Sequence, residues 1–341
     1  MRVFIHYAPK HKQDFFEGTR LRKTIKGACE LVDIEWVDFP SLSADVAHFI
    51  SPFDYPLLIQ KKNEGTPCVV SCGYAESEPR ASFFEEYIDG SLRLKFKAKK
   101  ILVASDVILV PSVATKEILE KSGINARIEI VEPAVNLKRF ALDSVDNEIF
   151  PRYFRIHDGT KTVVATGSYH DKKSVNLLKE LAIMCPEIEF YFFGSSSNAD
   201  PFNLIKAARA IGKSSNLHFC SLVQDDIYRS AMISSIAYIE SRSSKMDSIA
   251  LLEAFASRCQ VVGIGPVKNN PLLIDGKTCH LFKSAKELAS YLSSLYENKA
   301  KLTIMGAYDV AKGRSLLNLG KDLHSIYSSL INSETKEKSY D

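Results

Sequence analysis

The chain has 341 residues, of which 45% are hydrophobic and 25% are charged, and its formal net charge is only +3. A chain of this length and composition is expected to fold throughout into two domains, each large enough to bury its own core. The small net charge argues against the strong positive field of a nucleic-acid-binding protein, so no nucleic-acid partner is expected.

Seven cysteines are spread along the chain, and none forms a C-x-x-C pair. This spacing predicts buried, reduced thiols rather than a disulfide framework or a zinc site, and we expect no metal or other cofactor. The amino terminus enters a strand-like run without a signal-peptide pattern, and no apolar stretch approaches the length that spans a membrane. These features predict a cytoplasmic protein.

The first half of the chain alternates short apolar runs with amphipathic stretches, which is the pattern of βα units in a parallel sheet. Helices are expected at Arg20–Glu30 and Arg93–Ala104. Over residues 146–158 the periodicity lapses, and we interpret this as the crossing from a first domain, residues 1–150, to a second. The predicted strands are Val3–Tyr7, Val32–Val37, Val46–Ile50, Cys68–Ser71, Val107–Pro111 and Ile128–Val131.

The second half repeats the pattern over residues 151–315, so the predicted fold class is α/β, with two doubly wound, Rossmann-like lobes that face a cleft. A helix over residues 316–331 is expected to pack back on the first lobe, and residues 332–341 are expected to be frayed. The strands predicted here are Thr162–Thr166, Glu189–Phe193, Leu217–Phe219, Ser235–Ile239, Val261–Ile264 and His280–Phe282.

A turn with two lysines follows the first strand of the second lobe, and it includes Gly167, Ser168, Lys172 and Lys173. Ligands of open parallel sheets bind beyond the carboxyl ends of the strands, and lysines with free backbone N–H groups suit a diphosphate there. The same composition is also typical of an ordinary solvated connection, so this turn alone does not identify a site.

A second candidate lies at the start of the helix Ser248–Ser257. Ser248 is a plausible N-cap, and the amides near Ser248 and Ile249 form a second potential anion site. Glu253 lies off the apolar stripe of this helix, so we expect it to face the cleft and to accept hydrogen bonds from ribose hydroxyls. The alternative is a surface glutamate that complements the helix dipole.

In their order and spacing, these motifs resemble those of the family 4 glycosyltransferases, which have the two-lobed GT-B fold. Several ordered matches are more specific than any one of them alone. The resemblance implies that residues 1–150 bind the acceptor and residues 151–315 bind the nucleotide-sugar donor. The matching segments are Gly167 to Lys173, Asp225–Ala231, Leu252–Ala256, Gln260–Gly263 and Asn270–Lys277.

The resemblance also implies roles for individual donor-site residues. Lys173, supported by Gly167 and Lys172, is implied to pair with the donor diphosphate, the amides at Ser248 and Ile249 to hold a phosphate, and Glu253 to bind the ribose. Ser168 departs from the pattern because the family usually has an arginine there.

A second departure is Lys245, which replaces the glutamate that normally contacts the sugar. Asp247 is the nearest carboxylate that could act in its place.

Candidates in the first lobe are fewer. Gly18 and Arg20 are the only match to the family's glycine-rich loop, and Arg20 is expected to reach the donor phosphates, although a solvated helix start is an equal alternative. His48 lies in a segment that resembles a strand end of the family and is a catalytic candidate, together with Lys173 and Asp247, with a core histidine as the alternative. Glu76 and Arg80 are the polar residues nearest the expected acceptor site.

The segment Arg93–Lys100 is basic and amphipathic, which is typical of a contact with an anionic membrane surface, although an ordinary surface helix is the alternative. Together with the family resemblance, it implies transfer of a hexose from a UDP-sugar to a glycolipid or polysaccharide precursor, with retention of anomeric configuration, at the inner face of the membrane.

Two other functions remain open at this stage. The departures at Ser168 and Lys245, and the absence of a histidine near the expected acceptor site, favour a non-catalytic sugar-binding partner of a transferase. A nucleotide-sugar epimerase would share the donor site but would need paired carboxylate or histidine groups facing the sugar, which the sequence does not show.

Overall fold

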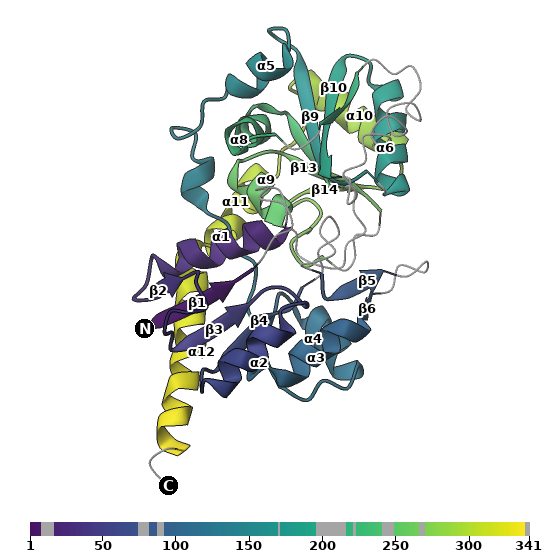
Figure 1. Ribbon diagram of the computed structural model, residues 1–341. Coiled ribbons are helices and arrows are strands. Elements are labelled where there is room, and N and C mark those ends of the chain that lie inside the picture. Colours follow the sequence, from purple (N-terminus) through teal and green to yellow (C-terminus); the bar gives the residue numbers. More distant parts are fainter. Residues whose placement is uncertain are drawn as a thin grey trace. The chain divides into compact units, whose positions relative to one another are not determined.

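The computed structural model describes residues 1–7, 17–73, 82–86, 92–169, 171–195, 216–220, 223–240, 249–265 and 270–337. The chain divides into two compact units, of which the first comprises Met1–Ala134 and Arg314–Asp341 and the second Val135–Gly313. Each unit contains a six-stranded parallel sheet flanked by helices (Figure 1). The division therefore lies before the predicted boundary at residue 150.

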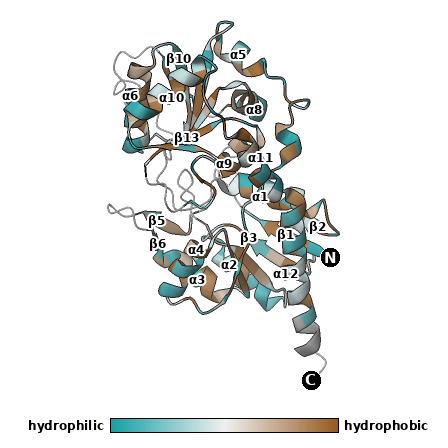
Figure 2. Ribbon diagram, turned by 180° about the vertical axis from the view of Figure 1, so that it is seen from behind, coloured by the Kyte–Doolittle hydropathy of each residue, from teal (hydrophilic) through white to brown (hydrophobic). Residues whose placement is uncertain are grey.

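The sheet of the first unit has the strand order β2-β1-β3-β4-β7-β8. Its central strands are almost wholly buried, and Figure 2 shows hydrophobic residues concentrated in the strands. Burial on both faces explains why these strands read as continuous apolar runs. The strands are β1 (Arg2–His6), β2 (Glu35–Val37), β3 (Val46–Phe49), β4 (Cys68–Ser71), β7 (Val107–Val110) and β8 (Arg127–Ile130).

The helices of the first unit are α1 (Glu17–Cys29), α2 (Tyr55–Asn63), α3 (Phe96–Ala104), α4 (Val113–Lys121) and α12 (Leu316–Glu337). A short antiparallel pair, β5 (Phe84–Glu86) and β6 (Leu92–Leu94), precedes α3. The predicted helix from Arg93 is therefore wrong at its start, because Arg93 lies in β6 and the helix begins at Phe96.

The C-terminal helix α12 belongs to the first unit and packs against α1. Gly320 permits this contact, since a Cβ atom there would lie 2.6 Å from the carbonyl oxygen of Ala28. Leu323 and Tyr327 of α12 are buried in the same core as Val3 of β1. The helix continues to Glu337, so the expectation that the chain frays from residue 332 is wrong.

The sheet of the second unit has the strand order β11-β10-β9-β12-β13-β14. The chain adds β10 and β11 on one side of β9 and then β12 to β14 on the other, so the topology switches between β9 and β12. Ligands of such sheets bind beyond the carboxyl ends of the strands at this switch. The strands are β9 (Lys161–Ser168), β10 (Ile188–Ser195), β11 (Leu217–Cys220), β12 (Ala237–Glu240), β13 (Val261–Ile264) and β14 (His280–Phe282).

Two groups of helices accompany this sheet. The helices α6 (Lys172–Met184) and α10 (Ala285–Tyr296) bury Leu178, Leu181, Leu288 and Leu292 in one core. The remaining helices contact one another in the pairs α5–α8, α9–α11 and η1 with both α8 and α9. They are η1 (Leu137–Phe140), α5 (Ile149–Phe154), α8 (Asp225–Ser234), α9 (Ile249–Ala256) and α11 (Ile304–Gly313).

Two expectations drawn from composition can be compared with these elements. All seven cysteines are buried and none forms a disulfide, as predicted. Burial raises the pKa of the Cys29 thiol to about 12. Within the described ranges, no helix is both long and apolar enough to cross a bilayer.

Candidate functional site

The carboxyl ends of β9 and β10 lie side by side, with Gly167 opposite Gly194 and Ser168 opposite Ser195. A Cβ atom at Gly194 would come within 2.7 Å of both the Gly167 carbonyl oxygen and the Tyr169 ring, so this approach requires a glycine. Tyr169 packs against Phe192 and Phe219, and its hydroxyl donates to the Cys220 carbonyl. The predicted glycine thus stands at the switch point, while the side chain of Ser168 lies outside the described residues.

The start of α6 is capped by Asp171. Its carboxylate accepts hydrogen bonds from the Lys173 amide (3.0 Å) and the Ser174 amide (3.3 Å), and also from the Ser174 hydroxyl. The expectation of free amides for a diphosphate is therefore wrong for Lys173 and Ser174, because an N-cap carboxylate satisfies these two. The side chains of Lys172 and Lys173 are exposed in the first turn of α6.

Glu253 is buried in α9, with only 2% of its surface exposed. Every residue of α9 from Ala250 to Ala256 is buried, so the alternative of a surface glutamate is wrong, whereas the expected contact of Glu253 with a ribose stays a prediction. A buried carboxylate requires partners. One oxygen, Oε2, accepts a hydrogen bond from the Tyr228 hydroxyl at 3.0 Å, and Oε1 lies 3.8 Å from Nη1 of Arg139.

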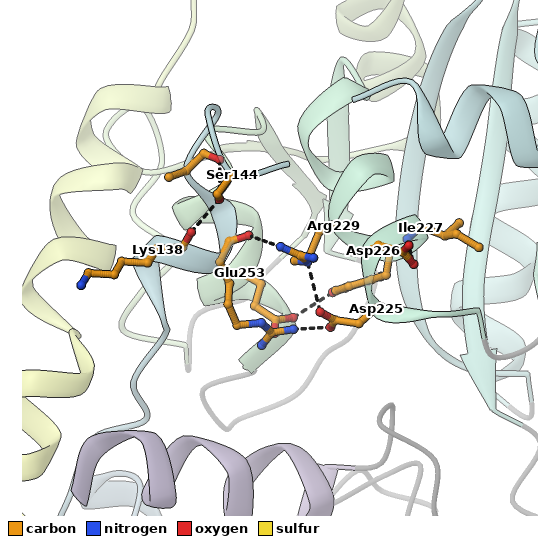
Figure 3. Close-up of polar contacts among 10 residues, drawn as sticks. Lys138, Ser144, Asp225, Asp226, Ile227, Arg229 and Glu253 are labelled. Carbon is orange, nitrogen blue, oxygen red and sulfur yellow. Dashed lines mark hydrogen bonds and ion pairs between the residues drawn. The ribbon is translucent and has the colours of Figure 1, made fainter. Parts of the chain in front are cut away.

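Arg139 also binds Asp225, the first residue of α8, so one guanidinium serves two carboxylates. Figure 3 shows Asp225 and Glu253, with Arg229 beside Asp225. Arg229, one turn further along α8, lies 3.1 Å from Asp225 and donates a 3.1 Å hydrogen bond to the Arg139 carbonyl. Two positive and two negative side chains therefore meet beside η1. We call Arg139, Asp225, Tyr228, Arg229 and Glu253 the Glu253 network.

The position of η1 is fixed at both ends by short polar side chains. Asn136 accepts from the Lys138 amide at 3.1 Å, and the Ser144 hydroxyl donates to the carbonyls of Lys138 (2.7 Å) and Ala141 (2.8 Å). Phe140, the last residue of η1, is buried. Arg139 is thus held toward α8 and α9 by a local turn, and sequence reasoning did not identify it.

Glu240 is a second buried carboxylate that sequence reasoning passed over. It ends β12 at the switch point and is 3% exposed. Gly263 of β13 lies opposite, where a Cβ atom would be 3.0 Å from the Glu240 carbonyl oxygen. In the sequence, Glu240 could have been noticed as a glutamate that directly follows the apolar residues Ala237-Tyr-Ile. Glutamate is seldom fully buried unless it is paired.

Several predicted donor and acceptor residues lie outside the described residues. They are Lys245, Asp247 and Ser248 before α9, and Glu76 and Arg80 after β4. Ile249 is described and begins α9. The roles of these residues remain predictions.

The glycine-rich loop proposed for the first unit is not a loop at Gly18. Gly18 and Arg20 both lie in the first turn of α1, and Gly18 is buried. The backbone carbonyl of Arg20 accepts a 2.9 Å hydrogen bond from the Thr24 hydroxyl within the same helix. Of the predicted loop and helix, only the helix that follows β1 in the chain is observed at these residues.

His48 is completely buried in β3. Its Nδ1 lies 2.6 Å from the Tyr327 hydroxyl and its Nε2 lies 2.7 Å from the Ser71 hydroxyl, so both ring nitrogens are engaged. Burial lowers the pKa of His48 to about 3. The catalytic assignment is not supported by this geometry, which matches the alternative of a core histidine.

Only part of the basic segment lies on the exposed face of α3. Phe96, Lys100 and Val103 share the spacing of one helix face and are exposed, Phe96 by 83%. The opposite face buries Ala98, Ile101 and Leu102. Lys95 is not part of this face, since its ammonium group donates to the Ser82 carbonyl at 2.8 Å.

Metal-binding geometry is a separate question. Among the described residues, no three or more histidine, cysteine, aspartate or glutamate side chains are grouped as a metal site would require.

Comparison with known proteins identifies the fold. No protein-family model matches the chain. A curated protein, the processive diacylglycerol alpha-glucosyltransferase of Acholeplasma laidlawii, is 20% identical over 311 residues, which cover 90% of this chain and 91% of the relative.

Solved structures give the same result. Anabaena HepE in complex with UDP-glucose has a TM-score of 0.70 at 12% identity and covers 96% of this chain and 99% of its own. The sucrose-phosphate synthase of Thermosynechococcus elongatus has a TM-score of 0.66 at 12% identity, with coverages of 96% and 81%. The predicted fold class and the resemblance to GT-B glycosyltransferases are therefore confirmed: the chain has two Rossmann-like units of the GT-B type.

Proposed function

We propose that this chain is a retaining glycosyltransferase, which moves a hexose from a UDP-sugar to a lipid or saccharide acceptor of the cell envelope. The observation that carries the proposal is the similarity to a diacylglycerol glucosyltransferase over nine tenths of both chains. The buried carboxylate of Glu253, in the unit whose switch point carries Gly167, agrees with it.

In this proposal the second unit binds the donor. Glu253 accepts hydrogen bonds from the ribose hydroxyls, because the two oxygens of an ionised carboxylate together offer several acceptor positions. The lysine side chains of Lys172 and Lys173 bind the diphosphate, since the α6 amides are already capped by Asp171.

The chemistry required of the protein is electrostatic. When the bond between the sugar and the diphosphate breaks, negative charge grows on the leaving oxygen, and fixed positive groups stabilise it. Lys173 and the amides at Ser248 and Ile249 are the proposed groups. Asp247 is the proposed carboxylate on the sugar side, and no metal takes part.

The first unit is proposed to bind the acceptor and the membrane. The exposed face of α3 combines Phe96 and Val103 with Lys100, the composition of a helix that lies on an anionic bilayer. Arg20 is proposed to reach the donor phosphates, and Glu76 and Arg80 are proposed to contact the acceptor. The protein would then work at the inner face of the membrane.

The first test is binding. Isothermal titration with UDP and GDP is expected to show binding of UDP in preference to GDP. If neither nucleotide binds, the transferase proposal is wrong and a non-catalytic partner is the better interpretation.

The second test is turnover. UDP-glucose and UDP-galactose are incubated with the protein and vesicles of anionic lipid that contain diacylglycerol, and glycolipid is detected by mass spectrometry. Proton NMR of the product then reports the anomeric configuration, and a β-linked product would contradict retention. Phe96→Ala is expected to lower vesicle binding, whereas Leu302→Ala, an exposed leucine of the second unit, serves as the matched control.

A further inference from the structure

The two carboxylates of the Glu253 network are paired with arginines in different ways. Asp225 is paired twice, by Arg139 and by Arg229, whereas the one guanidinium recorded beside Glu253 is that of Arg139. The other named contact of Glu253, the Tyr228 hydroxyl, is neutral. If Arg139 were lost, Asp225 would still be paired with Arg229. Glu253, which is far more buried, would lose the guanidinium of Arg139.

Two contacts of Glu253 lie on different oxygens of its carboxylate. Arg139 lies beside Oε1, and Tyr228 donates to Oε2. Because the contacts come from different elements, η1 and α8, the carboxylate lies between a cation and a hydroxyl donor and its movement is restricted. A group held in this way keeps its remaining acceptor directions constant, which is what a specific hydrogen bond to a ligand requires.

We propose that Arg139 is a positioning residue for nucleotide recognition, which holds the Glu253 carboxylate charged and oriented so that it can accept hydrogen bonds from the ribose hydroxyls. This inference rests on the proposed function. Arg139 itself touches no substrate in the proposal and acts through Glu253. Tyr228 supports the same carboxylate from the other side.

The test compares two ligands that differ only in the ribose. Calorimetry measures the dissociation constants of UDP and of the same nucleotide without its 2′ and 3′ hydroxyls, for wild-type protein and for Arg139→Met. The wild type is expected to prefer UDP by at least about tenfold, because hydrogen bonds from hydroxyls to a charged acceptor are among the stronger ones. In Arg139→Met the preference is expected to fall below about threefold.

Controls separate positioning from folding. Arg258→Met removes another arginine of the second unit, which stacks 4.5 Å from the Tyr308 ring, and it is expected to keep the full preference. Arg139→Lys keeps one cation but cannot reach both carboxylates with a planar fork, so an intermediate preference is expected. If Arg139→Met does not fold, Arg139→Lys provides the comparison.

The outcomes distinguish this inference from the proposed function. If wild-type protein binds neither nucleotide, the proposed function fails and the inference fails with it. If UDP binds and the folded Arg139 variants keep the wild-type preference for ribose hydroxyls, the inference alone is overturned. A double variant, Arg139→Met with Glu253→Gln, is expected to show no further loss of preference beyond Glu253→Gln.

Discussion

His48 in the first unit and Glu253 in the second are both buried, yet the protein accommodates them in different ways. His48 is neutral, and its two nitrogens join the Tyr327 and Ser71 hydroxyls in a chain of uncharged hydrogen bonds. Glu253 lies beside a cation, within a network of two arginines and two carboxylates. Uncharged groups are held in the interior at modest cost, whereas a buried carboxylate is retained only with partners.

The difference separates a structural residue from a candidate functional one. The sequence marks both residues as possible site residues, and burial alone does not distinguish them. The hydrogen bonds of His48 bind α12 and β4 to β3 within one core. The contacts of Glu253 instead join η1, α8 and α9 in the unit whose topology switches between β9 and β12. Perturbed or paired charges in such a place are typical of functional sites.

The largest effect is expected from Glu253→Gln. This change keeps the volume and the contact with Tyr228 but removes the charge, so nucleotide binding should weaken by about 10- to 100-fold, as hydrogen bonds to charged groups contribute about 1.5–3 kcal/mol. Calorimetry with UDP measures it. Glu297→Gln, which alters an exposed glutamate of the same unit, is the control. Unchanged affinity in Glu253→Gln would remove Glu253 from the donor site.

A smaller effect is expected from pH in the first unit. The pKa of His48 is about 3 in the folded protein against an ordinary value of 6.5, so the unfolded chain takes up a proton first as the pH falls. The contribution of neutral His48 to the free energy of unfolding is therefore fully present well above pH 6.5. Below that pH it decreases by about 1.4 kcal/mol per pH unit. Between pH 6.5 and 5 the free energy of unfolding should fall by about 2 kcal/mol.

Hydrogen exchange of peptides from β3 and α12 measures this loss locally, which matters because the chain has two units. His48→Gln cannot titrate and should show a shallower dependence over the same range. Equal slopes for the two proteins would contradict the assignment of the acid sensitivity to His48.

Tyr327→Phe should have a still smaller effect. It removes one hydroxyl from the neutral chain and leaves a ring nitrogen of His48 without its partner, at a cost of about 1–1.5 kcal/mol to the first unit. Hydrogen exchange in α12 reports the loss, and UDP affinity should stay unchanged. A fall in UDP affinity as large as that of Glu253→Gln would mean that the two regions do not differ in role as described.

Much of the fold was predictable because strands covered on both faces must be apolar. Val3, Phe4 and Ile5 are all fully buried, and such runs identified strands in both sheets. The helix was predicted to begin too early, at Arg93, because the basic residues of the segment Arg93–Lys100 continue an amphipathic pattern across the end of β6. A helical period does not show where a helix begins.

The site was predictable only in part. The position of Glu253 followed from local pattern, but its burial was missed, although Ile249-Ala-Leu-Leu-Glu-Ala-Phe-Ala is apolar on every side and therefore typical of a buried helix. Arg139 had no local signal. Its partner Asp225 lies 86 residues further along the chain, and the pairing exists only after the second unit has folded.

The smallest effect is expected from Asp171→Asn, which extends the comparison from Glu253 to the other proposed charge contact of the donor. Asparagine caps a helix as well as aspartate does, so α6 should remain stable. Removing the negative charge beside Lys172 and Lys173 should strengthen UDP binding about twofold, or about 0.5 kcal/mol, because exposed charges interact weakly in water. Asp309→Asn, on the exposed surface of α11, should leave the affinity unchanged. Unchanged affinity in Asp171→Asn would place the diphosphate away from α6, and Glu253 and Arg20 would then remain as donor contacts proposed from described side chains.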